Sequence, residues 1–252
     1  MAENSNSESL TVRDLSFSFG KKLKVLTNLS FSLNQEEVLA LVGPSGCGKT
    51  TIARLIGGFL SPASGEIRIN GTSAEKEELK GTVALFSQAP TLLPWRTMEG
   101  NIRLPLEFEK VDRSGASIDE AVETVGLMGF EKSYPDQLSG GMKQRAVFAR
   151  LIVAEHKLVL LDEPFSSLDD FSRQEMGQLF IEIQRSRKFA AVIVTHSIEE
   201  AVFLANKVVV LSARPGQVVS EHRISFEGPR TRELLKKQEF FNEVQKIRSL
   251  LP

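Results

Sequence analysis

The chain has 252 residues and a formal net charge of −1, so no global basic field is present to attract nucleic acid. Apolar residues make up 41% and charged residues 25%, which excludes general disorder, and the single cysteine, Cys47, excludes a disulfide within the chain. The apolar runs are far shorter than the roughly 20 residues that span a bilayer, so any membrane role is expected to come through a partner or the surface.

The N-terminal part of the chain predicts β-structure around one buried strand. Met1–Glu8 is small and polar, without the basic start and apolar run of a secretory signal. Between residues 10 and 42, apolar and polar residues alternate, which predicts half-buried, antiparallel strands. Val38–Val42 is a continuous apolar run, as expected of a strand in a buried parallel sheet. A helix over Thr50–Phe59 and a strand over Glu66–Asn70 are predicted next.

The middle of the chain changes character after a strand that is expected at residues 82–87. Prolines such as Pro90 and helical periodicity then replace the strand pattern over residues 89–156. Helices are predicted over Ile118–Leu127 and Gln144–Val153. We therefore expect a helical insertion that interrupts the sheet.

Strands and helices alternate in the C-terminal half, which predicts a mostly parallel sheet with helices on both faces. The expected strands are Leu158–Leu161, Ala190–Thr195 and Lys207–Leu211, with helices near residues 170–187 and 198–205. The tail, Thr231–Leu251, is charged and periodically apolar, and its helix would pack either on its own domain or on a partner. Its expected apolar stripe comprises Leu234, Leu235, Phe241, Val244, Ile247 and Leu251.

The strongest motif is GPSGCGKT at residues 43–50, which matches the complete phosphate-loop pattern between an apolar strand and a helix. Its glycines let the backbone wrap an anion with inward N–H groups, and the helix start adds the positive end of its dipole. Lys49 is expected to bind the β- and γ-phosphates of ATP, and Thr50 to give a hydroxyl ligand to Mg2+. The predicted nucleotide-binding residues here are Gly43, Pro44, Ser45, Gly46, Cys47, Gly48, Lys49, Thr50 and Thr51.

A second motif, LVLLDEP at residues 158–164, places two carboxylates at the end of a buried strand. Asp162 is expected to hold Mg2+ through water, and Glu163 to polarise the attacking water as a general base. Two solvated acids at a strand end would give the same letters, but a phosphate loop in the same chain favours the catalytic interpretation. The two motifs together predict ATP hydrolysis with Mg2+.

A third motif lies between these two. LSGGMKQR at residues 138–145 resembles the LSGGQ signature of the ATP-binding subunits of ABC transporters, with Met142 in place of the usual glutamine. This resemblance implies that Ser139, Gly140 and Gly141 bind the phosphates of an ATP held by a second ATPase subunit in a head-to-tail dimer.

The resemblance covers about Leu10–Gln217 and implies an α/β fold: a P-loop nucleotidase core with a mostly parallel sheet, an N-terminal antiparallel β part and a helical subdomain. The expected division is a core of residues 10–88 and 157–220, a helical subdomain of residues 89–156 and a C-terminal helical tail of residues 221–252.

Other elements of the family follow in the same order. Gln88 resembles the Q-loop glutamine, which implies a place beside Mg2+ and in catalysis, and Ser166–Asp169 resembles the D-loop. His196 resembles the switch histidine that contacts the γ-phosphate, although Ser197 stands where the family often has aspartate. Phe19 lies where an aromatic ring stacks on adenine, with a plain core position as the alternative.

A finer resemblance concerns the importer subfamily for nitrate, sulfonate, taurine and related small solutes. Ala89–Ile102 and Leu211–Val219 resemble that subfamily, most closely at Leu93, Pro94 and Trp95. These three residues are implied to dock the permease, with a core role for Trp95 as the alternative. The implied partners are a second ATPase subunit, transmembrane permease subunits and, through the permease, a solute-binding protein, and no nucleic acid is expected. The implied location is the cytoplasmic face of the cell membrane.

Two other function classes remain open from the sequence. One is an exporter or lipid-handling ATPase, which only the subfamily resemblance opposes. The other is an ABC-type ATPase that acts on nucleic acid or ribosomes. Such proteins usually carry a long coiled-coil insertion or two fused ATPase domains, and this chain shows neither pattern. The transported solute has no signature here because its binding site would lie on other chains.

Overall fold

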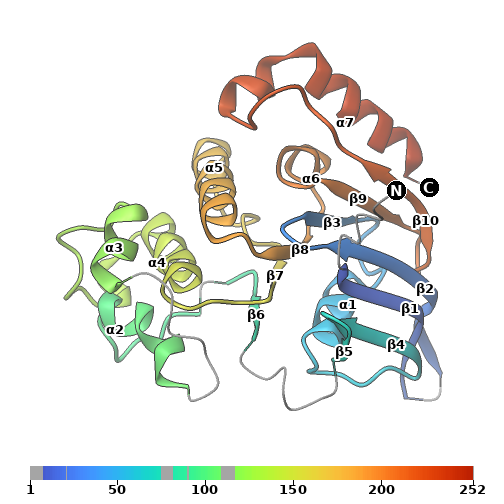
Figure 1. The fold of residues 1–252 in the computed structure, drawn as a ribbon, viewed down its shortest axis with the longest axis horizontal. Helices are drawn as coiled ribbons and strands as arrows, with labels where there is room; N and C mark the ends of the chain where they lie inside the picture. Colours follow the sequence, from blue (N-terminus) through green and yellow to red (C-terminus); the bar gives the residue numbers. More distant parts are fainter. Residues whose placement is uncertain (1–7, 21, 75–81, 90, 109–116, 252) are drawn as a thin grey trace, which may run out of the picture.

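The computed structural model describes residues 8–20, 22–74, 82–89, 91–108 and 117–251. The strands form a four-stranded sheet in the order β2-β1-β4-β5 and a six-stranded sheet in the order β10-β9-β3-β8-β7-β6 (Figure 1). Two sequence predictions, those on residues 1–7 of the N-terminus and on Pro90, lie outside the described residues.

The four-stranded sheet is antiparallel, as the alternating N-terminal pattern predicts. Its strands are β1 (Glu8–Phe19), β2 (Leu23–Asn34), β4 (Ser64–Ile69) and β5 (Thr72–Ser73). Alternate residues of β1 and β2 are buried, because one face of the sheet packs on the core and the other faces solvent.

The six-stranded sheet is parallel except at one edge. Its parallel strands are β3 (Val38–Val42), β6 (Val83–Phe86), β7 (Leu158–Asp162), β8 (Ala190–Val194) and β9 (Lys207–Leu211). The edge strand β10 (Val218–Arg223) pairs antiparallel with β9 and was not predicted as a strand. Its half-exposed sequence, VVSEHR, lacks the continuous apolar run of the central strands. Because β10 continues to Arg223, the expected tail boundary at residue 221 falls inside a strand.

Helices cover both faces of the parallel sheet. Alternate residues of each strand point to opposite faces and pack in two separate hydrophobic cores. On one face, Leu39, Leu41 and Val192 pack with α1 (Lys49–Ile56) and the antiparallel sheet. On the other face, Ala40 and Val210 pack with the remaining helices. That layer contains α5 (Asp170–Arg187), α6 (Ile198–Leu204) and α7 (Gln238–Leu250).

The predicted helical insertion is present, and Figure 1 shows it to one side of the two sheets. Its elements are α2 (Met98–Ile102), the 3-10 turn η2 (Leu104–Glu107), α3 (Ile118–Thr124), the 3-10 turn η3 (Pro135–Gln137) and α4 (Gly140–Val153). Helix α4 joins the insertion to the core through Phe148, whose ring lies 5.7 Å from that of Phe165 and 6.3 Å from that of Phe180. This helix starts four residues earlier than predicted, because the Ser139 side chain caps it.

Three helix predictions differ from the structure at their ends. Helix α3 ends at Thr124 instead of Leu127. Helix α1 stops at Ile56 instead of Phe59, because Gly57 follows and Gly58 adopts a left-handed backbone with φ of 72°. The tail is not one helix, because the 3-10 turn η4 (Arg232–Lys236) precedes α7.

The apolar stripe of the tail was also partly wrong. Phe240 is 3% exposed and packs with Val244 and Ile247 against the core, whereas the predicted stripe residue Phe241 is 50% exposed. Helix α7 contacts α6, β9 and β10, so in this structure it packs on its own domain. Among the described residues, no helix combines the length and apolar character needed to cross a membrane.

These neighbouring phenylalanines give a matched test of how the tail is held. Phe240→Ala is expected to lower the free energy of unfolding by about 3–5 kcal/mol, because it leaves a cavity in the core. Phe241→Ala is expected to change it by less than about 1 kcal/mol. Urea denaturation of both variants measures the difference. Equal losses would mean that α7 does not pack through Phe240.

Candidate nucleotide-binding site

The phosphate loop connects β3 to α1 and takes a shape that only glycine accommodates well. Gly46 and Gly48 adopt left-handed backbone angles, with φ of 76° and 107°. A Cβ atom on Gly48 would lie 2.7 Å from Cδ2 of Leu26 and 3.0 Å from Cγ1 of Val25, both on β2. The loop therefore packs tightly against β2 at Gly48. Gly48 is also the N-cap of α1.

Two side chains of this segment have defined partners. The buried ammonium group of Lys49 donates hydrogen bonds to the carbonyl oxygens of Gly43 (2.8 Å) and Pro44 (3.0 Å). The Thr50 hydroxyl donates to Oδ1 of Asp162, 3.0 Å away at the end of β7. The first helical turn thus presents a cation and a hydroxyl on the same side as the first acid of the β7 motif.

The two acids of this motif lie in different surroundings. Burial raises the pKa of Asp162, while the hydrogen bond from Thr50 acts in the opposite direction. Glu163 adopts a left-handed backbone with φ of 49°, which is uncommon for a residue other than glycine. Its N–H donates to the carbonyl of Val194 on β8 (2.8 Å), and Ser166 donates to its carbonyl through its hydroxyl (3.0 Å). These contacts hold the strained backbone of Glu163 in place.

His196 follows β8 and faces the second acid. Its Nδ1 atom lies 3.4 Å from Oε2 of Glu163, and its side chain is largely exposed. The preceding residue, Thr195, is buried, and its hydroxyl accepts a hydrogen bond from the N–H of Ser197 (3.0 Å). The histidine ring therefore projects from a fixed turn toward Glu163.

Lys49, Thr50, Glu163 and His196 line an open cavity of about 640 Å³ at the end of the parallel sheet. Asp162 does not line it and is connected to it through its hydrogen bond with Thr50. The predicted site residues that line it are Phe19, Ser45, Gly46, Gly48, Lys49, Thr50, Thr51, Glu163 and His196. Phe19 is 48% exposed, so the alternative of a core position does not describe it. Cys47, within the loop, is buried and packs in the hydrophobic core instead of lining the cavity.

Other predicted site residues lie away from this cavity. Gln88 is exposed in the loop that follows β6, at the same edge of the sheet but outside the lining. The signature residues Ser139, Gly140 and Gly141 lie at the start of α4 and do not line the cavity. The Ser139 hydroxyl accepts a hydrogen bond from the N–H of Met142 (3.3 Å). One chain by itself therefore does not bring the signature to the phosphate loop.

The expected docking segment lies at the surface of the helical insertion. Trp95 is 71% exposed, so the alternative of a core role does not describe it. Beneath it, buried Asn101 donates from Nδ2 to the carbonyls of Leu93, Arg96 and Thr97, each at 3.1 Å. Asn101 Oδ1 also accepts from the Leu93 N–H (2.7 Å).

A buried arginine of α4 holds the same segment from below. Arg150 donates to the carbonyls of Thr91 (3.0 Å) and Asn101 (2.9 Å) and to Oδ1 of Asn101 (3.0 Å). Burial lowers the pKa of its guanidinium to about 10. The exposed tryptophan thus sits on a rigid loop that is bonded to the helix carrying the signature.

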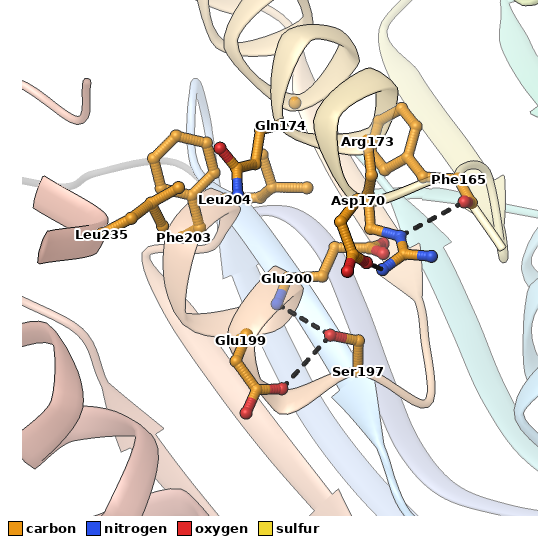
Figure 2. Close-up of a pocket in the computed structure, with 11 residues that line it drawn as sticks. Phe165, Asp170, Arg173, Gln174, Ser197, Glu199, Glu200, Phe203, Leu204 and Leu235 are labelled. Carbon is orange, nitrogen blue, oxygen red and sulfur yellow. Dashed lines mark hydrogen bonds and ion pairs between the residues drawn. The ribbon is translucent and has the colours of Figure 1, made fainter. Parts of the chain in front are cut away.

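Figure 2 shows a second cavity, of about 340 Å³, between α5 and α6. Glu200 extends from α6 toward Asp170 and Arg173 at the start of α5, and no described group forms a hydrogen bond with its Oε1 atom. Burial raises the pKa of Glu200 to about 7, although the Thr195 hydroxyl and the charge of Arg173 act against this rise. Sequence reasoning missed this carboxyl, because nothing in the letters IEEA tells which acid is buried.

Sequence reasoning also missed three residues that line the larger cavity, namely Leu23, Val25 and Arg214. Arg214 belongs to a segment that was singled out only for its subfamily resemblance. Its position beside the phosphate loop depends on the antiparallel return of β10, which the sequence did not predict.

Sequence comparisons with known proteins agree with the motifs described above. The family described as ABC transporter matches residues 26–166. The aliphatic sulfonates import ATP-binding protein SsuB of Bacillus subtilis (strain 168) is 39% identical over 213 residues, covering 84% of this chain and 82% of that protein. The taurine import ATP-binding protein TauB of Pseudomonas fluorescens is 38% identical over 204 residues, covering 80% and 76%.

A solved structure supports the fold independently of close sequence similarity. The structure of cbiO1 from Clostridium perfringens, part of the ABC transporter complex cbiONQ, matches with a TM-score of 0.77 at 22% identity. The match covers 97% of this chain and 98% of that one.

The raised pKa of Glu200 predicts a pH-dependent stability. Because the folded-state pKa lies above the usual value of 4.5, the protonated form favours folding, and this contribution is lost as pH rises through about 7. Glu200→Gln, which does not titrate, is therefore expected to gain roughly 2 to 3 kcal/mol relative to the unmutated protein between pH 5 and pH 8. Chemical denaturation at both pH values measures this change.

The neighbouring exposed acid gives the control. Glu199→Gln removes a carboxylate that pairs at the surface with Arg248 (2.8 Å), and it is expected to change the free energy of unfolding by less than about 1 kcal/mol at both pH values. A Glu200→Gln effect that is the same at pH 5 and pH 8 would contradict the assignment of a neutral, buried carboxyl.

Proposed function

Because this chain belongs to the ABC transporter family, we propose that it is the ATP-hydrolysing subunit of an importer for a small solute such as a sulfonate, taurine or nitrate. The observation that carries the reaction is the meeting of Lys49, the Thr50–Asp162 pair and the Glu163–His196 pair at one edge of the sheet. The names of the relatives, which import sulfonates and taurine, support the solute class.

In this proposal the phosphate loop binds the triphosphate of ATP. The N–H groups of the loop and the positive end of α1 attract the anion, and Lys49 adds a full charge. The Thr50 hydroxyl and the Asp162 carboxylate are hard oxygen donors, which fit Mg2+, an ion that takes its other ligands from phosphates and water. When bound, Mg2+ supplies neutralisation of charge on the phosphate oxygens. Gln88 is assigned to the same ion.

Glu163 is assigned the role of general base. Its carboxylate lines the cavity beside the place of the γ-phosphate and accepts a proton from the attacking water. His196, 3.4 Å from this carboxylate, is assigned to contact the γ-phosphate and to keep Glu163 in place. The hydrogen bonds that fix the Glu163 backbone support this role, since a base must be positioned before its pKa matters.

A second ATPase subunit is assigned the remaining part of the site. Ser139, Gly140 and Gly141 present N–H groups at the start of α4, on a surface that is separate from the cavity. In a head-to-tail dimer, these groups would bind the ATP of the partner, with Ser166–Asp169 beside the shared interface. ATP favours the closed dimer because it binds both surfaces only in that state, and hydrolysis removes the difference.

The partner in the membrane is proposed to be a permease that docks on the Leu93–Trp95 segment. Trp95 presents a large exposed ring on a loop that Asn101 and Arg150 hold rigid, and exposed aromatic anchors are typical of interfaces. Docking would place the chain at the cytoplasmic face of the membrane, with a solute-binding protein reached through the permease. Alternating access of the permease would then follow the closing and opening of the ATPase dimer.

Glu163→Gln tests the site as a whole. This change keeps the size of the side chain but removes the proposed base and an anionic group beside the γ-phosphate. Hydrolysis is expected to fall to a trace while ATP binding is retained or improved. ATP, but not ADP, is then expected to shift the purified protein from monomer to dimer on size exclusion.

Adding Ser139→Arg to this variant tests the signature. A bulky side chain on that surface is expected to abolish the ATP-dependent dimer without affecting ATP binding to the monomer. A dimer that persists would contradict the role of the signature in the partner's site. Undiminished hydrolysis by Glu163→Gln alone would contradict the assignment of the base.

Trp95→Ala tests the docking surface. Loss of an exposed interface anchor is expected to weaken permease association by about 2 kcal/mol or more and to reduce transport. The ATPase activity of the isolated subunit and its thermal unfolding are expected to stay unchanged, because the ring is outside the core. Co-purification with the permease from membranes measures association. Normal assembly and transport would reject this surface as the docking site.

A further inference from the structure

The turn between β9 and β10, residues 212–217, is packed directly on the phosphate loop. The N–H of Gly216 donates to the carbonyl of Val25 (2.8 Å), and the N–H of Thr27 donates to the carbonyl of Gly216 (3.1 Å). A Cβ atom on Gly216 would lie 2.3 Å from the carbonyl oxygen of Cys47. The turn therefore touches both β2 and the phosphate loop at a point where only glycine fits.

The rest of the turn is held by its own hydrogen bonds. The Ser212 hydroxyl donates to the carbonyls of Ala213 (2.9 Å) and Pro215 (3.2 Å) and accepts from the N–H of Gln217 (3.1 Å). The N–H of Ser212 donates to the carbonyl of Gln217 (2.9 Å), which closes the turn. Arg214 is thus carried on a fixed backbone.

Arg214 is an exposed cation at the wall of the nucleotide cavity. It lines the cavity of about 640 Å³, and it makes no hydrogen bond or ion pair with any described residue. Arg54 and Arg185 are also exposed and unpaired among the described residues, but neither lines this cavity. Arg223, on the adjacent strand β10, pairs with Glu37 at 2.9 Å. The guanidinium of Arg214 is therefore available to a molecule that enters the cavity.

The neighbours of Arg214 indicate which part of a nucleotide it faces. Its turn is bonded to β2, and β2 contributes Leu23 and Val25 to the cavity wall, next to Phe19 at the end of β1. This wall is apolar and aromatic, which suits a purine. The groups for the phosphates, Lys49 and Thr50, lie on α1 instead.

We propose that Arg214 is a second nucleoside-binding residue, which contacts the adenosine part of ATP bound in this cavity. The inference rests on the proposed function of the site and adds a residue to it. A planar guanidinium stacks on aromatic faces and donates hydrogen bonds in its own plane. The side chain thus complements Phe19, whose half-exposed ring offers a stacking face but no hydrogen bond.

The experiment compares nucleotides with inorganic triphosphate. Arg214→Ala is expected to raise the Kd of ATP and of ADP by a similar factor, about tenfold, and to leave the Kd of inorganic triphosphate unchanged. KM for ATP is expected to rise by the same factor while kcat is retained. Arg214→Lys, which keeps the charge but not the plane, is expected to recover little of the loss.

Two further variants distinguish a wrong role for Arg214 from a wrong function for the whole site. Arg223→Ala removes the same charge from the adjacent strand and is expected to leave all three Kd values unchanged, which controls for net charge. Lys49→Ala is expected to abolish binding of triphosphate and ATP alike. Failure of the unmutated protein to bind ATP would overturn the proposed function itself.

Other outcomes decide against Arg214 alone. If Arg214→Ala weakens triphosphate binding as much as ATP binding, the contact is with phosphate and the nucleoside assignment is wrong. Unchanged ATP binding in Arg214→Ala would place the guanidinium outside the site. A fall in thermal stability shared by Arg214→Ala and Arg214→Gln would make the residue structural.

Discussion

The parallel pairing of β3, β8 and β7 is the constraint on which the whole site depends. Because parallel strands all end at one edge of a sheet, the phosphate loop, the acid pair and His196 follow three neighbouring strands to the same place. The register is strict, since a slip of one residue would exchange the two buried faces of every strand. Pairing of Asp162 with Val194 and the hydrogen bond from Glu163 to Val194 extend this register into the turn that carries the acid pair.

Hydrogen bonds from buried polar side chains connect the parallel sheet to the helical insertion. Gln144 on α4 donates to the carbonyl of Pro164, directly after the acid pair, at 2.6 Å. Arg150, less than two turns later on the same helix, donates a hydrogen bond to the segment that carries Trp95. A helix is stiff, so a displacement at the docking segment and one at the acid pair would be linked through α4. Leaving such buried donors unpaired is costly, and this resists independent movement of the two ends.

The cavity between α5 and α6 is also connected to the loops of the candidate site. Arg173 donates to the carbonyl of Leu168 (2.8 Å) in the D-loop, and Glu200 lies between this arginine and the turn that carries His196. Protonation of Glu200 near neutral pH would leave Asp170, 2.7 Å away, as the acidic partner of Arg173. The Ser166–Asp169 segment and the turn that carries His196 are therefore both connected to the surroundings of Glu200, whose protonation depends on burial more than on the nearby charge of Arg173.

The sequence by itself determined the chemistry of the site and most of the central strands. Continuous apolar runs and the motifs around Lys49 and Glu163 are local patterns, so the central strands and the residues proposed to bind ATP and Mg2+ could be predicted from them. Only the tertiary structure decided the antiparallel return of β10 and the burial of Phe240 in place of Phe241. It also decided the positions of Arg214 and Glu200. Those outcomes depend on contacts between distant segments, as when Gly216 meets Cys47 and Val25, and no local periodicity encodes such contacts.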